Sequence, residues 1–164
     1  MELPESFCDA WSKRATVARR PGEPGLFVCL APMDGVTDHV HRGLVSDLFG
    51  GRSGMSMCVS EFVRVTNQLL PPKVFRRHCP ELDHGCHTNA GVPVFVQLLG
   101  GIPQAMADNA ARVAEMGAIG IDLNFGCPAK TVNKNRGGSI LLNDPEEVFS
   151  IVNQVRKQVP GDIP

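Results

Sequence analysis

Short apolar runs alternate along this chain with longer polar or amphipathic segments, and this alternation restricts the folds open to it. Apolar runs occupy residues 26–31, 55–60, 93–98 and 118–123. Unbroken runs of this length are typical of strands buried on both faces of a parallel sheet. Each is followed by a segment with helical periodicity or by a polar stretch rich in Gly and Pro. Four β-then-α units in succession predict an α/β protein with a parallel sheet.

Three amphipathic helices are predicted between and after these strands. The first would be capped by Thr37 or Asp38 and would stop at the glycines of 50–51. The second would begin at about Pro103 and end before Gly117. The positions that we expect these two helices to bury are Val40, Leu44, Val45 and Leu48 in the first, and Met106, Ala110, Val113 and Ala114 in the second.

The third predicted helix has the clearest start signal. Asp144 suits the N-cap, Pro145 the first helical position and Glu147 a capping box. The helix would end near Arg156 and Lys157, which complement its dipole. Its expected buried positions are Val148, Ile151, Val152 and Val155.

The number of units favours one architecture. The first strand lacks the Gly-rich dinucleotide fingerprint that would indicate a doubly wound sheet. A TIM (β/α)8 barrel takes about 250 residues, and four units are half of one. We therefore predict a truncated barrel over residues 26–164, which stops where the next strand should begin, at 162–164. Residues 1–25 read as a poorly ordered extension, with a short helix around Trp11 as the alternative.

Composition excludes several classes of protein. The net charge of −1 means that any nucleic-acid contact depends on local basic patches. No run approaches the roughly 18 apolar residues of a membrane span, and the acidic N-terminus is unlike a secretory signal. We expect a cytoplasmic protein whose six cysteines are reduced thiols.

The His and Cys residues between 78 and 87 suggest a metal site only superficially. His78, Cys79, His84, Cys86 and His87 lie close together, as zinc ligands can. Their spacing fits no standard finger, so no metal is expected.

Polar residues follow each predicted strand, where the functional groups of a barrel gather. Pro32, Met33 and Asp34 follow the first strand, and Glu61 follows the second. Gln97 lies at the end of the third, and residues 124–127 follow the fourth. Amide side chains both donate and accept hydrogen bonds, which suits the edge of a flavin or uracil ring. Cys127 lies in a Gly-flanked loop with Lys130 nearby, a setting that favours a reactive thiol over an inert one.

Four ordered motifs at these strand ends resemble those of tRNA-dihydrouridine synthases. They are Ala31-Pro32-Met33-Asp34-Gly35, Glu61-Phe62-Val63, Val96-Gln97-Leu98-Leu99-Gly100 and Asp122-Leu123-Asn124-Phe125-Gly126-Cys127-Pro128. The resemblance runs from about residue 28 to the end of the chain. The stretch from Glu61 to Phe75 further resembles the bacterial C subfamily, which modifies position 16 of tRNA.

The resemblance implies a flavin-binding TIM barrel and a role for each motif. Pro32, Met33 and Asp34 would contact FMN, and Gln97 would hydrogen-bond its ring. Asn124 would hold the target uracil, and Arg64 and Lys130 would contact tRNA. Cys127 would be the general acid. NADPH would reduce FMN, a hydride would pass to C6 of uracil, and Cys127 would protonate C5 to give 5,6-dihydrouridine.

Two basic segments agree with an RNA partner, since phosphate contacts need such groups. They are Lys73, Arg76, Arg77 and His78, and Lys130, Lys134 and Arg136. Arg136 stands where the family usually has a glycine. We expect tRNA rather than DNA or a membrane as the partner, and a monomeric full-length enzyme.

The resemblance also limits what these 164 residues should do alone. The family's flavin site draws on the second half of the barrel for a lysine, a histidine and the loops around the FMN phosphate. We therefore expect the isolated chain to be inactive. Two alternatives remain open: a flavin-dependent pyrimidine dehydrogenase acting on a small molecule, and a non-catalytic remnant. Activity on tRNA compared with free pyrimidines separates the first alternative, and the coding sequence after Pro164 separates the second.

Overall fold

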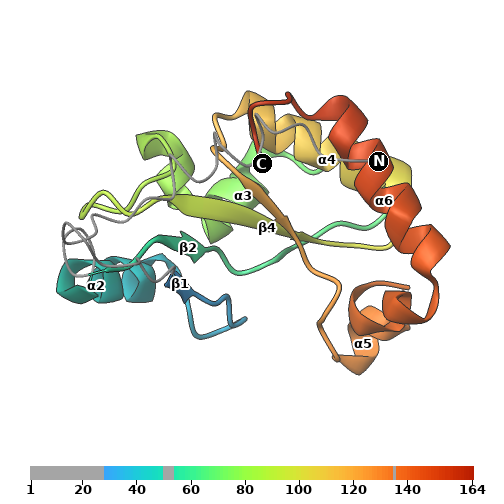
Figure 1. Ribbon diagram of the computed structural model, residues 1–164, viewed down its shortest axis with the longest axis horizontal. Helices are drawn as coiled ribbons and strands as arrows, with labels where there is room; N and C mark the ends of the chain where they lie inside the picture. The colour runs from blue at the N-terminus through green and yellow to red at the C-terminus, as the bar shows by residue number, and fades with distance from the viewer. Residues whose placement is uncertain (1–27, 50–53, 135) are drawn as a thin grey trace, which may run out of the picture.

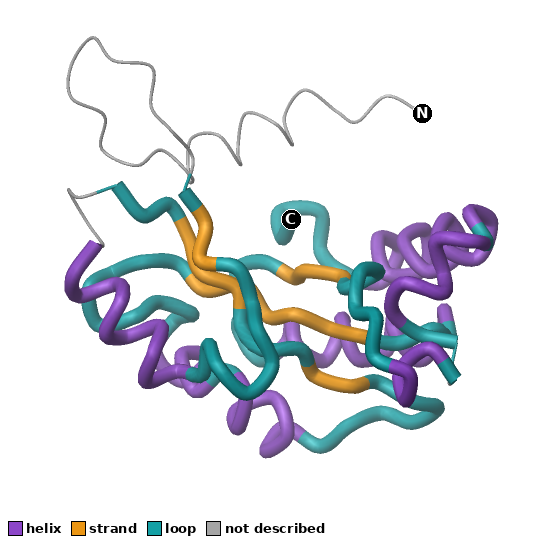
Figure 2. Tube along the Cα trace, turned by 90° about the horizontal axis from the view of Figure 1, so that it is seen from below, coloured by secondary structure: helices purple, strands orange, loops and turns teal. Residues whose placement is uncertain are grey.

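A parallel sheet forms the centre of the molecule. The computed structural model describes residues 28–49, 54–134 and 136–164. The predicted extension at 1–25, the start of the first predicted strand and the glycines of 50–51 lie outside the described residues. The strands are β1 (Cys29–Leu30), β2 (Met57–Val59), β3 (Val63–Arg64), β4 (Val94–Leu99) and β5 (Ile121–Leu123). Figure 2 shows them side by side through the middle of the described chain.

All strand pairs are parallel, and β4 holds the sheet together. β1 pairs with β2, and β2 pairs with the first half of β4. The short β3, which the sequence did not predict, pairs with the second half of β4 through Val63↔Leu98. β5 pairs with β4 through Gln97↔Asp122. When β2 and β3 are taken together as successive partners along one edge of β4, the strands follow chain order, as in the opening arc of a (β/α) barrel.

The chain end continues this order. The carbonyl oxygen of Pro164 accepts a hydrogen bond of 3.0 Å from the amide of Ile121 in β5. The residues where we expect the next strand therefore already lie beside the preceding one.

Helical segments link the strands. They are α2 (His39–Phe49), α3 (Pro72–His78), α4 (Pro103–Glu115), α5 (Lys130–Asn133) and α6 (Pro145–Gln158), with the 3₁₀ turns η2 (Pro80–His84) and η3 (Gly138–Asn143). The sequence predicted α2, α4 and α6 but not the shorter segments. α4 and α6 pack against each other (Figure 1).

The predictions for α4 are confirmed at both ends and on its buried face. Pro103 is its first residue, and Gly117 follows its end with a φ of +93° that suits glycine. Met106, Ala110 and Val113 are buried, and Ala114 is partly buried.

α6 begins as predicted but buries a narrower stripe. The Asp144 carboxylate accepts a hydrogen bond of 3.1 Å from the Glu147 amide, which confirms the N-cap. The capping box does not close, because the Asp144 amide donates to the Leu141 carbonyl instead. Ile151 and Val155 are buried. The prediction for Val152 was wrong, since its side chain is 44% exposed.

The buried face of α2 was also predicted wrongly. Asp38 caps the helix, as expected, by accepting from the His41 amide at 2.9 Å. The side chains that the helix buries, however, are Arg42 and Ser46. Three of the four expected apolar positions are exposed, and only Val45 is partly buried. The physical reason is that Arg42 finds buried oxygen partners beneath the helix, which fixes the helix's rotation about its axis.

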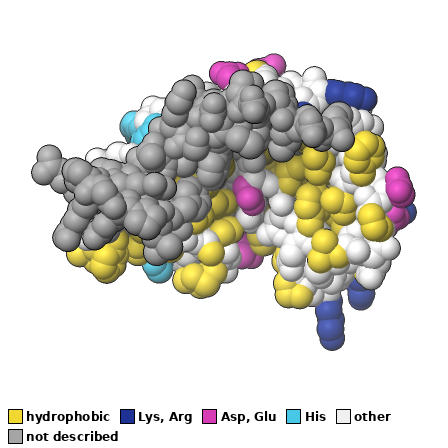
Figure 3. Space-filling model, viewed as in Figure 1, with side chains coloured by type: hydrophobic (Ala, Val, Ile, Leu, Met, Phe, Trp, Pro, Cys, Tyr) yellow, Lys and Arg dark blue, Asp and Glu magenta, His cyan; other side chains and the backbone are white. Residues whose placement is uncertain are grey.

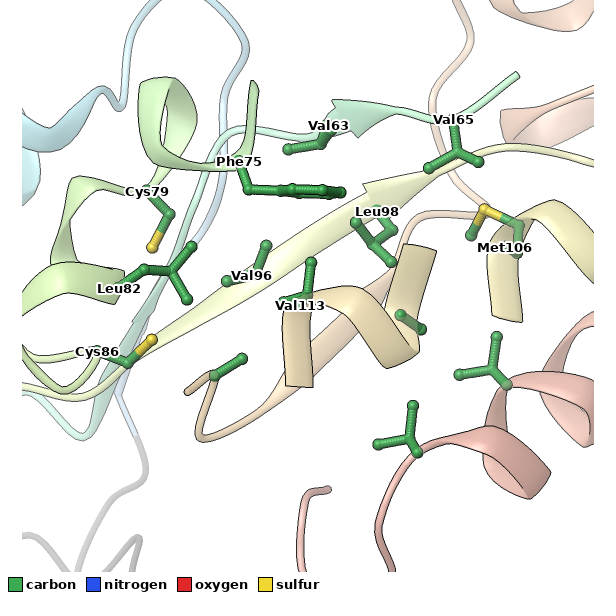
Figure 4. Packing of buried hydrophobic residues seen from close by; sticks show 14 of the residues in the cluster. Val63, Val65, Phe75, Cys79, Leu82, Cys86, Val96, Leu98, Met106 and Val113 are labelled. Carbon is green, nitrogen blue, oxygen red and sulfur yellow. The ribbon is translucent and has the colours of Figure 1, made fainter. Parts of the chain in front are cut away.

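The main core lies between the sheet and the helices (Figure 4). Val94, Val96 and Leu98 project from one face of β4 and are fully buried with Phe75 of α3 and Val113 of α4.

Two cysteines of the His and Cys cluster belong to this core rather than to a metal site. Cys79 and Cys86 are fully buried. A hydrogen bond with Cys86, together with burial, raises the pKa of the Cys79 thiol. Within the described residues, no group of three His, Cys, Asp or Glu side chains is placed to hold a metal ion. The described cysteines are free thiols, and Cys8 lies outside them.

The helices that the structure describes are too short or too polar to cross a lipid bilayer.

Candidate functional site

Polar side chains meet where β4 and β5 end. Successive side chains of a strand point to opposite faces, so Gln97 lies on the face opposite Val96 and Leu98. Asp122 pairs with Gln97 across the strands and lies on the same face. Asn124 follows β5 directly. Its backbone N–H donates to the Leu98 carbonyl at 2.9 Å, which extends the sheet by one residue.

These three side chains form one hydrogen-bonded series. Gln97 Nε2 donates to Asp122 Oδ2 at 2.6 Å. Asn124 Nδ2 donates to Gln97 Oε1 at 3.0 Å. Gln97 is buried, and the other two are half-buried. The sequence-predicted residues Gln97 and Asn124 are therefore in direct contact.

The same series holds Cys127. Asn124 Oδ1 accepts hydrogen bonds of 3.0 Å from the backbone amides of both Gly126 and Cys127. On the other side, the Cys127 carbonyl accepts from the Ser139 amide at 2.9 Å. The thiol of Cys127 is thus carried on a backbone fixed from both directions, and the residue is half-buried.

Gly138 is needed for this arrangement. Its φ is +68°, and a Cβ placed there would lie 2.4 Å from the Cys127 carbonyl oxygen. A side chain at 138 would therefore displace the backbone that carries the thiol. The neighbouring Arg136 also has a positive φ, of 53°, which explains why glycine suits that position.

The turn after β1 is built by its own hydrogen bonds and by Glu61. The Met33 amide donates to Thr37 Oγ1 at 2.7 Å, and its carbonyl accepts from the Thr37 amide at 2.9 Å. Gly35 donates to Glu61 Oε1 at 2.6 Å, which ties this turn to the end of β2. Met33 and Asp34 are exposed and Pro32 is half-buried. Among the described residues, no hydrogen bond joins this turn to Gln97.

Arg64 and Lys130 lie in one place although they are far apart in sequence. The Arg64 guanidinium donates to the Thr131 carbonyl at 3.1 Å, which connects β3 with α5. Lys130 is the first residue of α5 and is exposed. Arg64 therefore contacts α5, the segment that follows the Cys127 loop and begins with Lys130.

The two predicted basic patches differ in how much of their charge is compensated. In α3, Arg76 forms an ion pair with Asp83 at 2.7 Å, so part of the charge of this patch is neutralised. In the second patch, Arg136 approaches Asp144 only to 3.9 Å. The second patch is also the one beside Cys127.

Sequence reasoning missed two residues that organise the site. Asp122 was read only as part of a motif, and Ser60 was not considered. The Ser60 hydroxyl accepts from the Gln97 amide at 3.1 Å and donates to the Glu61 carbonyl at 2.9 Å. A signal for Asp122 was present, because it is the one charged residue in the apolar run 118–123.

Comparisons with known proteins agree with these motifs. The family model described as dihydrouridine synthase matches residues 29–164. The chain is 54% identical over 137 residues to the tRNA-dihydrouridine(16) synthase of Vibrio parahaemolyticus, covering 84% of this chain and 41% of that protein. It is 50% identical to the protein of the same name from Pseudomonas putida, with 84% and 41% covered. For the Escherichia coli protein of that name the identity is 49%, with 84% and 42% covered. The chain thus spans less than half the length of these relatives.

Proposed function

Because this chain belongs to the dihydrouridine synthase family, whose fold is a TIM barrel, we propose that it carries the catalytic acid of an enzyme that reduces uridine in tRNA. The product would be 5,6-dihydrouridine, formed by reduction of the C5=C6 bond. The relatives' names specify position 16, and we propose the same position here. The observation that carries the proposal is the hydrogen-bonded series from Gln97 through Asn124 to the backbone of Cys127.

The polar groups at the strand ends fit a flavin. After their bonds to each other, Gln97 retains one N–H and one acceptor lone pair, and Asn124 retains one N–H. The free N–H and acceptor of Gln97 suit the alternating donors and acceptors of an isoalloxazine edge, and the free N–H of Asn124 remains for the uracil. Pro32, Met33 and Asp34 would line the same ligand from the turn after β1, where Glu61 holds the backbone. We therefore propose FMN as the cofactor.

Bound FMN would supply a hydride to C6 of the uracil ring. The remaining step is a proton transfer, which we assign to Cys127. Addition at C6 leaves enolate-like charge that a nearby acid can quench at C5. The backbone bonds to Asn124 and Ser139 would hold the thiol at one position relative to the ring. Asn124 would orient the uracil through its free N–H.

Arg64 and Lys130 would contact the tRNA. Arg64 keeps donors free beyond its bond to Thr131, and the exposed Lys130 precedes Thr131 on the segment that Arg64 contacts. A uridine must leave its stack to reach a buried ring system, so the neighbouring phosphates need a cationic support. The second basic patch, with Lys134 and Arg136, would extend this support. We also propose NADPH as the electron donor and the cytoplasm, where tRNA is modified, as the location.

The test uses a fusion of this chain to the remaining part of the Vibrio parahaemolyticus relative, supplied with FMN, NADPH and unmodified tRNA. Mass spectrometry of digested tRNA should show dihydrouridine at position 16, and free uridine should not be reduced. Cys127→Ala should abolish product formation while leaving FMN bound, because only the proton donor is removed. The matched control is Cys29→Ala, which removes another thiol from the described strands.

Two results would contradict the proposal. Reduction of free uridine in preference to tRNA would indicate a small-molecule dehydrogenase. Normal product formation by the Cys127→Ala protein would show that another group protonates C5.

A further inference from the structure

We propose that Asp122 is a positioning residue, which fixes the direction of the amide series and thereby the place of the Cys127 backbone. The carboxylate of Asp122 can only accept hydrogen bonds when ionised. Gln97 must therefore turn its NH₂ toward Asp122, as the 2.6 Å contact from Nε2 to Oδ2 requires. One acceptor at the start of the series thus decides how a buried amide is oriented.

The orientation then passes to the next amide. Because the NH₂ group of Gln97 donates to Asp122, its Oε1 points toward Asn124. Asn124 must therefore donate to Gln97 through Nδ2. Asn124 is left with Oδ1 on its other side, and this oxygen accepts from both Gly126 and Cys127. Reversal of either amide would set two donors or two acceptors against each other. Asp122 is three bonds of this series away from Cys127 and need not touch any substrate.

The location of Asp122 supports this role. β5 is half-buried throughout, and Asp122 shares a face with the buried Gln97. Burial first, and then the Asp122 charge, raise the pKa of the Cys29 thiol on β1. Because Asp122 shares its face with Gln97, its carboxylate lies on the face of the sheet opposite the buried Val96 and Leu98.

The inference deepens the proposed function, but its first test does not depend on any catalytic activity. The backbone amides of Gly126 and Cys127 are held by Asn124 Oδ1, so their hydrogen exchange reports on its orientation. D122N keeps the shape of the side chain and adds a competing NH₂ donor. It should accelerate exchange of these two amides about tenfold in the 164-residue chain, the effect of losing one net hydrogen bond.

D108N is the matched control, because Gln104 Nε2 donates to Asp108 Oδ1 at 2.7 Å on the exposed surface of α4. This second Gln–Asp pair is remote from the series, and its loss should leave both amides unchanged.

A double variant restores the donor-to-acceptor direction of the hydrogen bonds in the series without restoring Asp122. In D122N/Q97E, the new amide donates to the new carboxylate, which can again accept from Asn124 Nδ2. Exchange of Gly126 and Cys127 should return to within about twofold of the parent, although both single variants exchange faster. A non-additive rescue of this kind would not arise if Asp122 served packing alone. Because the double variant regains the pairing, it also provides the measurement if D122N folds poorly.

The fusion enzyme gives the second readout. At saturating tRNA, D122N should slow reduction of uridine by about ten- to a hundredfold, while the Kd for tRNA stays within about twofold. The role of Asp122 would be overturned if D122N left amide exchange at Gly126 and Cys127 unchanged. It would also be overturned if these amides exchanged as fast in the double variant as in D122N. A parent fusion that reduces no tRNA would instead overturn the proposed function, and the exchange experiment would still decide the role of Asp122.

Discussion

At the scale of single residues, the backbone conformation of Arg136 predicts how a substitution there changes stability. Its φ of 53° is unfavourable for a residue with a Cβ. Its guanidinium gains little in return, since it is exposed and lies 3.9 Å from Asp144. Arg136→Gly should therefore raise the free energy of unfolding by roughly 0.5–1 kcal/mol, measured by urea denaturation.

Arg136→Ala is the control for this change, because it removes the charge and keeps the strained φ. It should leave stability nearly unchanged. A larger gain from alanine than from glycine would show that the charge, and not the backbone, is unfavourable.

The pH dependence of stability follows from a second residue, Cys58. Burial raises the pKa of its thiol from 9.0 to about 11. Folding thus favours the neutral thiol, so its contribution is complete below pH 9 and disappears as the pH rises through 11. The free energy of unfolding should fall by roughly 1.4 kcal/mol per pH unit in that window. Cys58→Val, which cannot ionise, should fall less steeply in the same denaturation series, and equal slopes would contradict the assignment.

Residue patterns predicted which site residues come together better than how they are held. Gln97, Asn124 and Cys127 stand at strand ends in sequence, and β4 and β5 bring them into one series. The partners of that series could not be deduced, because hydrogen bonds between side chains depend on register. Only the pairing Gln97↔Asp122 shows that an acid within an apolar run has a buried amide beside it.

At the scale of elements, the link between α2 and η2 depends on one buried ion pair. Arg42 is fully buried and contacts both Glu81 oxygens, through Nε at 2.9 Å and Nη2 at 2.8 Å. It also donates to the carbonyls of Thr37 and His78. Arg42→Ala should lower the free energy of unfolding by about 3–5 kcal/mol, because Glu81 would remain buried without its partner.

Arg76→Ala tests the same type of contact in a different environment. The ion pair of Arg76 with Asp83 has a similar distance of 2.7 Å, but its side chains are 46% and 50% exposed. Its loss should change stability by no more than about 1 kcal/mol. Urea denaturation of both variants provides the comparison, and equal losses would contradict the importance of burial.

The ion pair between Arg42 and Glu81 explains why α2 was predicted less well than α4. In α4 the apolar residues Met106, Ala110 and Val113 define the buried face, and periodicity identifies them. In α2 the apolar residues are as regularly spaced, but the buried acceptors of Arg42 lie in segments up to 39 positions away. Helical periodicity contains no information about such partners. The helix was predicted correctly and its rotation was not.

At the scale of the whole molecule, the order of strands was predictable because parallel units add neighbours in sequence. The additional strand β3 after β2 was not, since it depends on pairing with the second half of β4. The arc leaves apolar side chains exposed at both of its ends. Figure 3 shows them at the lower left, around α2, and on the right, around α6. They are Val40, Leu44, Leu48 and Phe49 at one end, and Ile140, Leu142, Phe149 and Val152 at the other.

These two surfaces predict how the 164-residue chain behaves in solution. Leu44 and Leu48 are 60% and 61% exposed on one face of α2, and contiguous apolar surface of this kind favours association. Among the described residues, β1 pairs with one strand only, so its other edge has backbone groups without a strand partner, which also favours association. Sedimentation should therefore show self-association that increases with concentration.

L44E/L48K should shift the distribution toward monomer with little effect on stability, because both side chains are already exposed. Asp47→Lys on the same helix changes charge without removing apolar surface and should leave association unchanged. Association that persists in L44E/L48K would place the contact at the α6 end of the arc instead.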